Sequence, residues 1–219
     1  MTTLYLYALL GAPPPRGRWQ GLCGEPLRFL RVAGVVLATG PMSRAPAPSP
    51  RALRRHDAVV RRLARVVPAV LPARFGALVS DDALADLIAP QAPALRRALA
   101  LVAGREQMTL RLFGKAVRAA PLLPGGPGTR YLTSRSSAAL LARPELARLR
   151  RTLAGLVRAE RIEPSRTPPL LGSVYHLVDR GQRRAYQRAL RSVTCQLADL
   201  RVVHSGPWTP YAFAPEPGG

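Results

Sequence analysis

The residues with the chemistry to catalyse a reaction or to bind a metal are few, and they lie far apart. The three histidines are His56, His176 and His204, and their spacing does not suggest a shared metal site. Each falls within an expected helix or strand, so we interpret them as packed or surface histidines. The adjacent carboxylates Asp81 and Asp82 stand at an expected helix start, where acidic side chains favour the positive end of the helix dipole. We interpret them as capping residues and not as an acid–base pair.

Motifs for nucleotide binding or nucleophilic catalysis are not recognisable either. Residues 125–128 are Gly-Gly-Pro-Gly, but the Lys-Ser/Thr of a phosphate-binding loop is missing, and the proline removes one backbone N–H group. Serine and cysteine occur without a nucleophile elbow or a dyad spacing. Cys23 and Cys195 are isolated, which favours reduced, buried thiols. We therefore expect no catalytic residue, no cofactor and no metal, and we predict that the chain is not an enzyme.

Charge is the most extreme property of the composition. The 219 residues hold 33 basic and 12 acidic side chains, a formal net charge of +21, and Lys115 is the only lysine. Such a surface attracts nucleic acids and anionic lipids without sequence specificity. The expected strands carry the aromatics Phe113 and Tyr175, but nothing matches the basic-glycine-aromatic block of RNA-binding sheets. Nucleic-acid binding therefore remains an alternative function that rests on charge alone.

Residues 1–103 are predicted to form a small mixed α/β domain. Its expected strands are residues 3–9, 30–38 and 73–79. Residues 41–50 contain four prolines and predict a loop. A helix is predicted to begin at Ser49-Pro50, with apolar residues every three to four positions and arginines mostly on the opposite, solvated face. A second helix is expected to begin at Ser80, to be interrupted by Pro90 and Pro93, and to end at Gly104.

Residues 104–219 predict the element order β-α-β-β-α-β. The expected strands are residues 106–113, 161–165, 172–179 and 200–204, and the expected helices are residues 129–160, broken near Pro144, and 182–198. This order is the ferredoxin-like plan, in which two helices cover four antiparallel strands. The sequence therefore predicts an α+β protein of two domains, with a boundary near residue 104.

Two short segments are candidate structural or interaction motifs. The first is Leu71-Pro72-Ala73-Arg74-Phe75-Gly76. Pro72 favours an extended residue before it, Phe75 can fill a core, and Gly76 permits a turn. Arg74 could pair with Asp57 or Asp81 within the domain, and a contact with a partner is the alternative.

The second motif is the C-terminal tail. Its candidate residues are Gly206, Pro207, Trp208, Pro210, Tyr211 and Phe213. The two prolines prevent a helix, and the stiff aromatic strip could dock on an apolar surface with little loss of side-chain entropy. We expect the tail to pack against the second half of the chain, with Trp208 buried. The alternative is a strip that docks on a partner.

Six blocks follow one another along this chain: Tyr5-Leu6-Tyr7-Ala8, Arg55-His56-Asp57-Ala58-Val59, the 71–76 segment, Gly128-Thr129-Arg130-Tyr131-Leu132, Val174-Tyr175-His176-Leu177-Val178, and the tail. In this order they resemble the gas vesicle protein F/L family (GvpF/GvpL), whose members end on a GPW-x-PY-x-F signature. No single block is specific, but together they extend from residue 5 to residue 213.

The resemblance implies a non-enzymatic minor component or assembly factor of gas vesicles. Its implied partners are the small hydrophobic shell protein and other accessory proteins, with no specific nucleic acid. The first residues lack the basic region of a signal peptide, and no apolar run approaches the roughly 20 residues needed to span a bilayer. We therefore expect no membrane partner, and a location in the cytoplasm at the gas vesicle.

Overall fold

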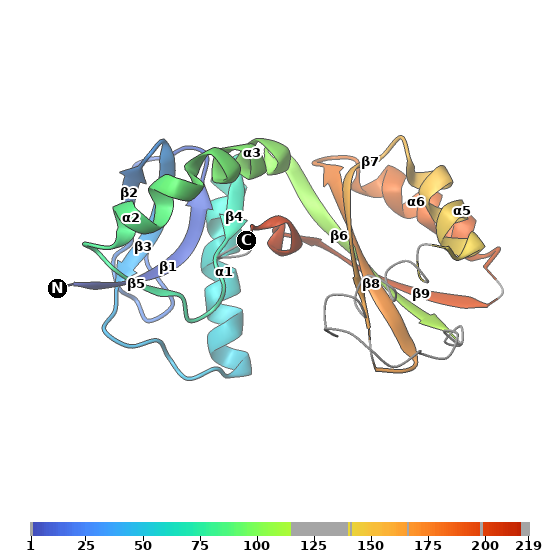
Figure 1. Ribbon diagram of the computed structural model, residues 1–219, viewed down its shortest axis with the longest axis horizontal. Helices are drawn as coiled ribbons and strands as arrows, with labels where there is room; N and C mark the ends of the chain where they lie inside the picture. Colours follow the sequence, from blue (N-terminus) through green and yellow to red (C-terminus); the bar gives the residue numbers. More distant parts are fainter. Residues whose placement is uncertain (1, 115–139, 141, 166, 198, 216–219) are drawn as a thin grey trace, which may run out of the picture. The chain divides into compact units, whose positions relative to one another are not determined.

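The computed structural model describes residues 2–114, 140, 142–165, 167–197 and 199–215 (Figure 1). The chain divides into two compact units. The first unit contains the residues up to Arg105 together with the C-terminal residues from Thr209 onward. The second unit runs from Glu106 to Trp208. The glycine-rich segment 125–128 and the Gly128–Leu132 block lie outside the described residues.

The first unit is built on an antiparallel sheet. Its strands are β1 (Thr3–Leu10), β2 (Arg28–Val32), β3 (Val35–Pro41), β4 (Val70–Pro72) and β5 (Leu78–Ser80). The sheet order is β2-β3-β1-β4, and β5 also pairs with β1. The single strand expected at residues 30–38 is wrong: β2 and β3 form a hairpin, because Ala33 and Gly34 both adopt positive φ and turn the chain. The strand expected at 73–79 is also wrong, since β4 and β5 lie on either side of a loop.

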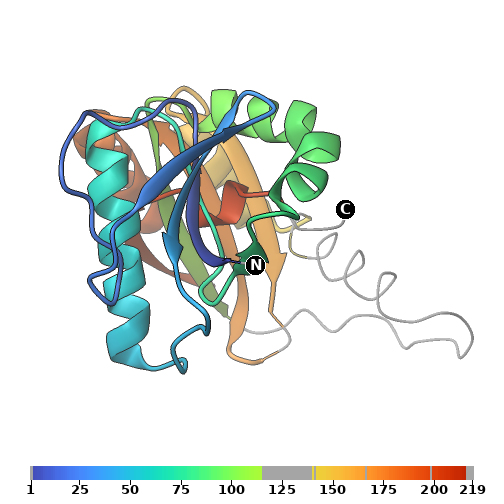
Figure 2. The same cartoon turned by 90° about the vertical axis from the view of Figure 1, so that its left-hand side faces the viewer.

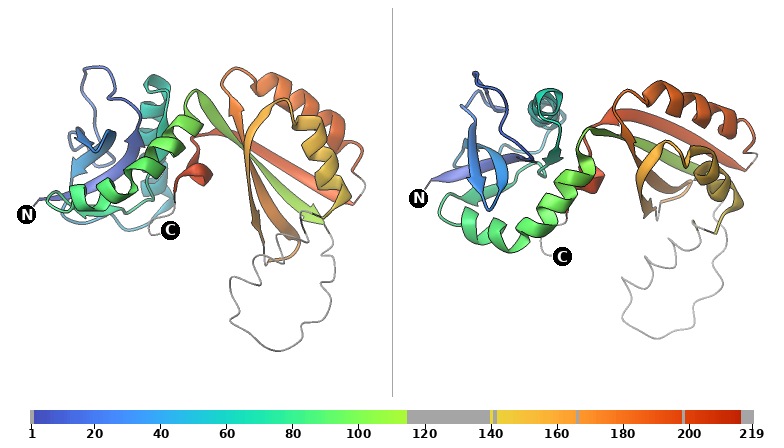
Figure 3. Two further views of the ribbon diagram at one scale, coloured as in Figure 1. Left: turned by 45° about the horizontal axis from the view of Figure 1, so that its top comes forward. Right: turned by 90° about the horizontal axis from the view of Figure 1, so that it is seen from above.

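Helices cover both faces of this sheet. They are α1 (Pro50–Val66), α2 (Leu84–Ile88), a 3₁₀ turn η1 (Ala89–Gln91) and α3 (Ala92–Val102). Figure 3 shows α1 on one side of the sheet and α2 with α3 on the other. The start of α1 is confirmed, because the Ser49 hydroxyl accepts a hydrogen bond from the Ala52 N–H at 3.1 Å. The Asp81-Asp82 pair does not cap α2, whose N-cap is Ala83.

The second unit contains one four-stranded sheet. Its elements are β6 (Arg105–Gly114), α5 (Pro144–Leu153), β7 (Val157–Pro164), β8 (Leu170–Asp179), α6 (Arg183–Thr194) and β9 (Leu200–Trp208). The sheet order is β7-β8-β6-β9, and α5 and α6 lie on the same side of it (Figure 1). The expected helix over residues 154–160 is wrong. Strand β7 begins at Val157 because its alternating residues pair with β8, so tertiary pairing overrides the local helical periodicity.

Each unit has its own hydrophobic core. In the first, β1 and α1 supply buried side chains that include Tyr5, Tyr7 and Leu63. In the second, the sheet and both helices enclose a cluster that includes Met108, Leu149 and Tyr186. Cys23 and Cys195 are free as expected, but both are exposed and not buried. No helix within the described residues is long and apolar enough to cross a bilayer.

Candidate functional site

A hydrogen-bonded cluster in the first unit joins three of the sequence blocks. The Gly76 N–H donates to the Tyr5 hydroxyl oxygen at 2.9 Å, and that hydroxyl lies 3.0 Å from His56 Nδ1. His56 Nε2 lies 3.2 Å from the Ala73 carbonyl oxygen. A carbonyl can only accept, so Nε2 carries a proton, and in the neutral imidazole Nδ1 then accepts from Tyr5. The contacts therefore define one neutral tautomer of His56 and tie β1, α1 and the loop after β4 together.

Aromatic packing surrounds this cluster. The Phe75 ring lies edge-on to Tyr5 and to His56, with centroids 6.3 and 5.8 Å apart, and the Tyr7 ring stacks on His56 at 5.6 Å. Burial lowers the pKa of His56, which favours the neutral form that the hydrogen bonds require. Burial also raises the pKa of Tyr5. The interpretation of His56 as a packed histidine is confirmed, since its side chain is 3% exposed.

The four candidate residues of the 71–76 segment differ in burial and in backbone conformation. Pro72 is buried at the end of β4, where it pairs with Ala8. Phe75 is half-buried against the rings just described, and Arg74 is exposed. Gly76 has a φ of +86°, a conformation that other residues adopt only with strain. The glycine is therefore needed to present its N–H to Tyr5.

The end of the tail joins this same cluster. Residues Tyr211–Phe213 form a 3₁₀ turn, η2, that contacts β4. The Tyr211 hydroxyl donates to Asp57 Oδ1 at 3.2 Å, and Asp57 directly follows His56 on α1. Phe213 is 5% exposed, and Pro210 is also buried. The expectation that the tail packs against the second half is wrong for these residues, because their contacts are with the first unit.

The beginning of the tail belongs to the second unit. Gly206, Pro207 and Trp208 end strand β9, which pairs with β6. Gly206 has a φ of +121°, and a Cβ there would lie 2.8 Å from the Gln107 carbonyl oxygen, so no other residue fits. The expected burial of Trp208 is wrong. Its side chain is 40% exposed, and its indole N–H donates to Ser205 Oγ at 3.1 Å.

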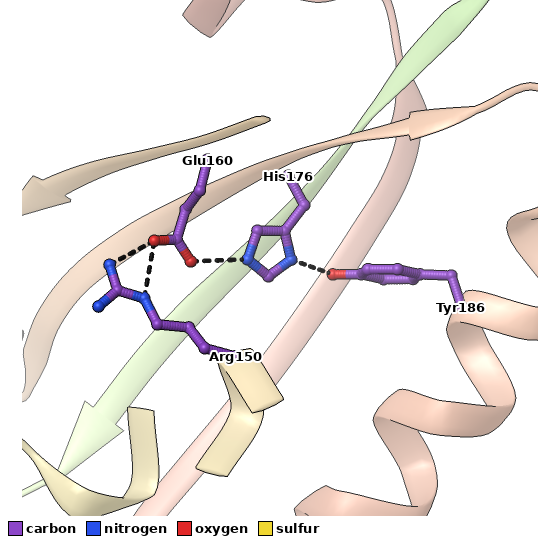
Figure 4. Close-up of polar contacts among 4 residues, drawn as sticks. All are labelled: Arg150, Glu160, His176 and Tyr186. Carbon is purple, nitrogen blue, oxygen red and sulfur yellow. Dashed lines mark hydrogen bonds and ion pairs between the residues drawn. The ribbon is translucent and has the colours of Figure 1, made fainter. Parts of the chain in front are cut away.

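A second polar cluster lies in the second unit and was not anticipated (Figure 4). The Tyr186 hydroxyl lies 2.7 Å from His176 Nδ1, and His176 Nε2 lies 3.1 Å from Glu160 Oε2. The other oxygen of Glu160 accepts from Arg150, with Nε at 2.9 Å. A signal existed in the sequence, because His176 alternates with Val174 and Val178 and therefore faces inward. Its carboxylate partner, Glu160, was not recognised because residue 160 was wrongly predicted to lie in a helix.

Electrostatics in this second cluster favour an ionised Glu160. Partial burial opposes the charge, but the hydrogen bonds and charges of His176 and Arg150 outweigh burial and lower the pKa of Glu160 to about 2. Burial, with the nearby Glu160 charge, raises the pKa of Tyr186. A Tyr–His–Glu chain could relay a proton in an open site. Here Tyr186 is fully buried and His176 is 2% exposed, so both side chains are packed within the core of the second unit.

Among the described residues, the third histidine lies apart from both clusters. His204 is exposed on β9. Within the parts of the chain that the structure describes, no group of three or more His, Cys, Asp or Glu side chains could hold a metal ion. The His56-Asp57 block, the 71–76 segment and the tail end thus meet in the first unit, whereas Gly206, Pro207 and Trp208 lie in the second.

Comparison with known proteins identifies the family of the chain. The sequence profile of the family described as gas vesicle synthesis protein GvpL/GvpF matches residues 3–215. The chain belongs to this family. Its members are not known as enzymes, and membership supports a role in gas vesicles. No curated protein matches the chain.

Solved structures show the same fold at low sequence identity. The gas vesicle protein GvpF from Microcystis aeruginosa aligns with a TM-score of 0.74 and 17% identity, covering 99% of this chain and 100% of that one. GvpF from Anabaena sp. PCC7120 aligns with a TM-score of 0.73 and 17% identity, covering 99% of both chains. These matches establish a mixed α+β fold with two antiparallel sheets for the GvpL/GvpF member described here.

Proposed function

We propose that this protein is a non-enzymatic accessory or minor structural protein that acts in gas vesicle assembly by contacting the hydrophobic shell protein. The observation that carries the proposal is the family match over residues 3–215. The convergence of the His56-Asp57 block, the 71–76 segment and the tail end on one packed surface supports it. The protein acts in the cytoplasm at the growing vesicle, together with other accessory proteins.

The exposed members of the motifs are the proposed contact residues. Arg74, Trp208 and Tyr211 keep large side chains at the surface, and exposed aromatic and arginine side chains are enriched among residues that dominate protein interfaces. The buried members, such as Pro72 and Phe213, support the fold. This division separates a role in binding from a role in stability.

The complex with the shell protein should survive about 0.5 M salt, because apolar contacts persist when the Debye length is only a few Å and exposed charge pairs are screened. The measurement is co-expression with the shell protein of the same source, followed by pull-down at low and high salt. Alanine at Trp208 should reduce recovery without lowering the melting temperature, because Trp208 is exposed. Leu87→Ala is the matched control, since Leu87 is 44% exposed but lies outside the motifs. Loss of all binding at high salt would contradict the proposal.

The second unit is proposed to be a ferredoxin-like domain. The support is the element order β6-α5-β7-β8-α6-β9 with the sheet order β7-β8-β6-β9 and both helices on one side. The boundary near residue 104 coincides with Gly104, whose φ of +69° ends the segment after α3. A domain of this kind has its own core and can fold alone.

A fragment of residues 106–208 should fold alone and melt in one cooperative transition. Extending it to residue 219 should leave its melting temperature unchanged within about 2 °C, since the tail end makes its contacts in the first unit. Circular dichroism on both fragments checks this. A fragment without a cooperative transition would show that the two units share one core, and a large gain from the extension would show that the tail stabilises the second unit.

A further inference from the structure

The outer face of α1 carries a continuous stripe of arginines. The stripe consists of Arg51, Arg54, Arg55, Arg61, Arg62 and Arg65, all of them exposed. At 100° per residue these positions fall within an arc of about 120°, opposite the buried side chains, and they extend over about 21 Å. Figure 2 shows α1 along its whole length at the border of the first unit.

The charge of this arginine stripe is hardly compensated. Asp57 is the only acidic residue of α1, and its carboxylate lies 3.9 Å from Arg61. Arg62 lies over the Trp19 ring at 4.7 Å. Within the described residues, the side chains of Arg51, Arg54, Arg55 and Arg65 make no hydrogen bond or ion pair. Like charges three and four positions apart destabilise a helix, so the stripe repels itself until an anionic partner binds.

A small side chain lies at the centre of the stripe. Ala58 is exposed and is surrounded at positions i−4, i−3, i+3 and i+4 by four arginines of the stripe. Its small side chain leaves space between the long ones, as in the holes that receive side chains when two helices pack. An acidic side chain entering this space would meet several guanidinium groups, which bind carboxylates through paired hydrogen bonds.

Exposed apolar side chains flank the stripe on both sides, and one of them is Val66, which is 45% exposed. Leu53 is 46% exposed, and Tyr211 is 37% exposed. Leu53 lies one turn before Asp57, the residue that holds the Tyr211 hydroxyl. A nucleic acid backbone would gain nothing from such a border, whereas an amphipathic helix has apolar residues beside its charged ones.

We propose that the outer face of α1 is a docking surface for an acidic amphipathic helix of a partner protein. Acidic residues of the partner, three or four positions apart, would lie along the arginine stripe, and its apolar residues would cover Leu53 and Val66. This contact is electrostatic and salt-sensitive, unlike the proposed shell contact, so it does not depend on that function.

Two synthetic peptides test the proposal with the full-length protein. Both have the same composition of about 20 residues, a helix of sufficient length to cover the stripe. One places its glutamates on one helical stripe bordered by leucines, and the other distributes the glutamates around the helix. Fluorescence anisotropy at low salt should show about tenfold tighter binding of the aligned peptide, because several modest exposed ion pairs must add together.

Charge-reversed variants locate the site. Arg51→Glu, Arg54→Glu and Arg55→Glu combined should abolish the preference for the aligned peptide. The matched control reverses three exposed arginines of α6, Arg184, Arg188 and Arg191, and should retain it. Equal binding of both peptides, equal loss in both variants, or tighter binding of a 20-base-pair DNA duplex through the same stripe would overturn the proposal.

Discussion

Replacing His56 by alanine should lower the free energy of unfolding of the first unit by roughly 3–5 kcal/mol. The histidine side chain is buried, so its removal leaves a cavity between β1, α1 and the loop after β4. It also leaves the Tyr5 hydroxyl without its acceptor and the Ala73 carbonyl without its donor. Tyr5→Phe, which removes only the hydroxyl, should cost less, about 1–3 kcal/mol.

Urea denaturation followed by tryptophan fluorescence measures this effect. The two tryptophans lie in different units, so a Trp208→Phe background leaves Trp19 as the reporter of the first unit. His204→Ala is the matched control, because His204 is exposed on β9 and should change stability little. If His56→Ala were as mild as His204→Ala, the cluster would not hold the first unit together.

Acid should destabilise the second unit through Glu160. The pKa of this carboxyl falls from 4.5 to about 2 in the folded protein, so the folded state binds fewer protons than the unfolded state between these values. The associated stability is fully present above about pH 4.5 and is lost as the pH falls through 2. A shift of this size corresponds to at most about 3 kcal/mol, and solvent screening of the half-buried carboxyl reduces this, so stability should fall measurably across that window.

Glu160→Gln separates this carboxyl from the other acidic groups. The amide keeps the shape but has no charge, so the variant should be less stable at pH 7 and should lose this part of the acid dependence. Glu163→Gln is the control on the same strand, because Glu163 is exposed and accepts a hydrogen bond only from Tyr175 among the contacts described. Denaturation of each variant between pH 2 and 7, with Trp208 as reporter, gives the result. If stability depended on pH in the same way in Glu160→Gln, the acid sensitivity would have to come from other titratable groups.

Local sequence signals predicted some elements well. Ser49-Pro50 defined the start of α1, since capping and a fixed proline φ act within one turn of helix. The apolar seam of α6, with Tyr186, Leu190 and Val193, is buried as its spacing indicated. The hairpin of β2 and β3 was missed because Ala33 is not a usual turn residue, yet it adopts a φ of +46°.

The candidate residues show the same division between local and long-range causes. The conformational roles of Gly76 and Gly206 follow from residue type, since only glycine tolerates their positive φ. The partner of Tyr211 could not be predicted, because Asp57 lies 154 positions earlier in the chain. Trp208 shows that an aromatic residue in a motif need not be buried, since its neighbours determine its exposure.

The sequence by itself determined the charge, the order of the family blocks, and the helices whose apolar periodicity and caps act over a few residues. Only the tertiary structure decided that Tyr5, His56 and Gly76 share hydrogen bonds across 51 and 71 positions, and that the tail end packs in the first unit. The physical reason is the separation along the chain over which each interaction acts. Backbone propensity and capping act between neighbours, whereas a buried polar group is satisfied by whatever donor or acceptor the whole chain brings to it.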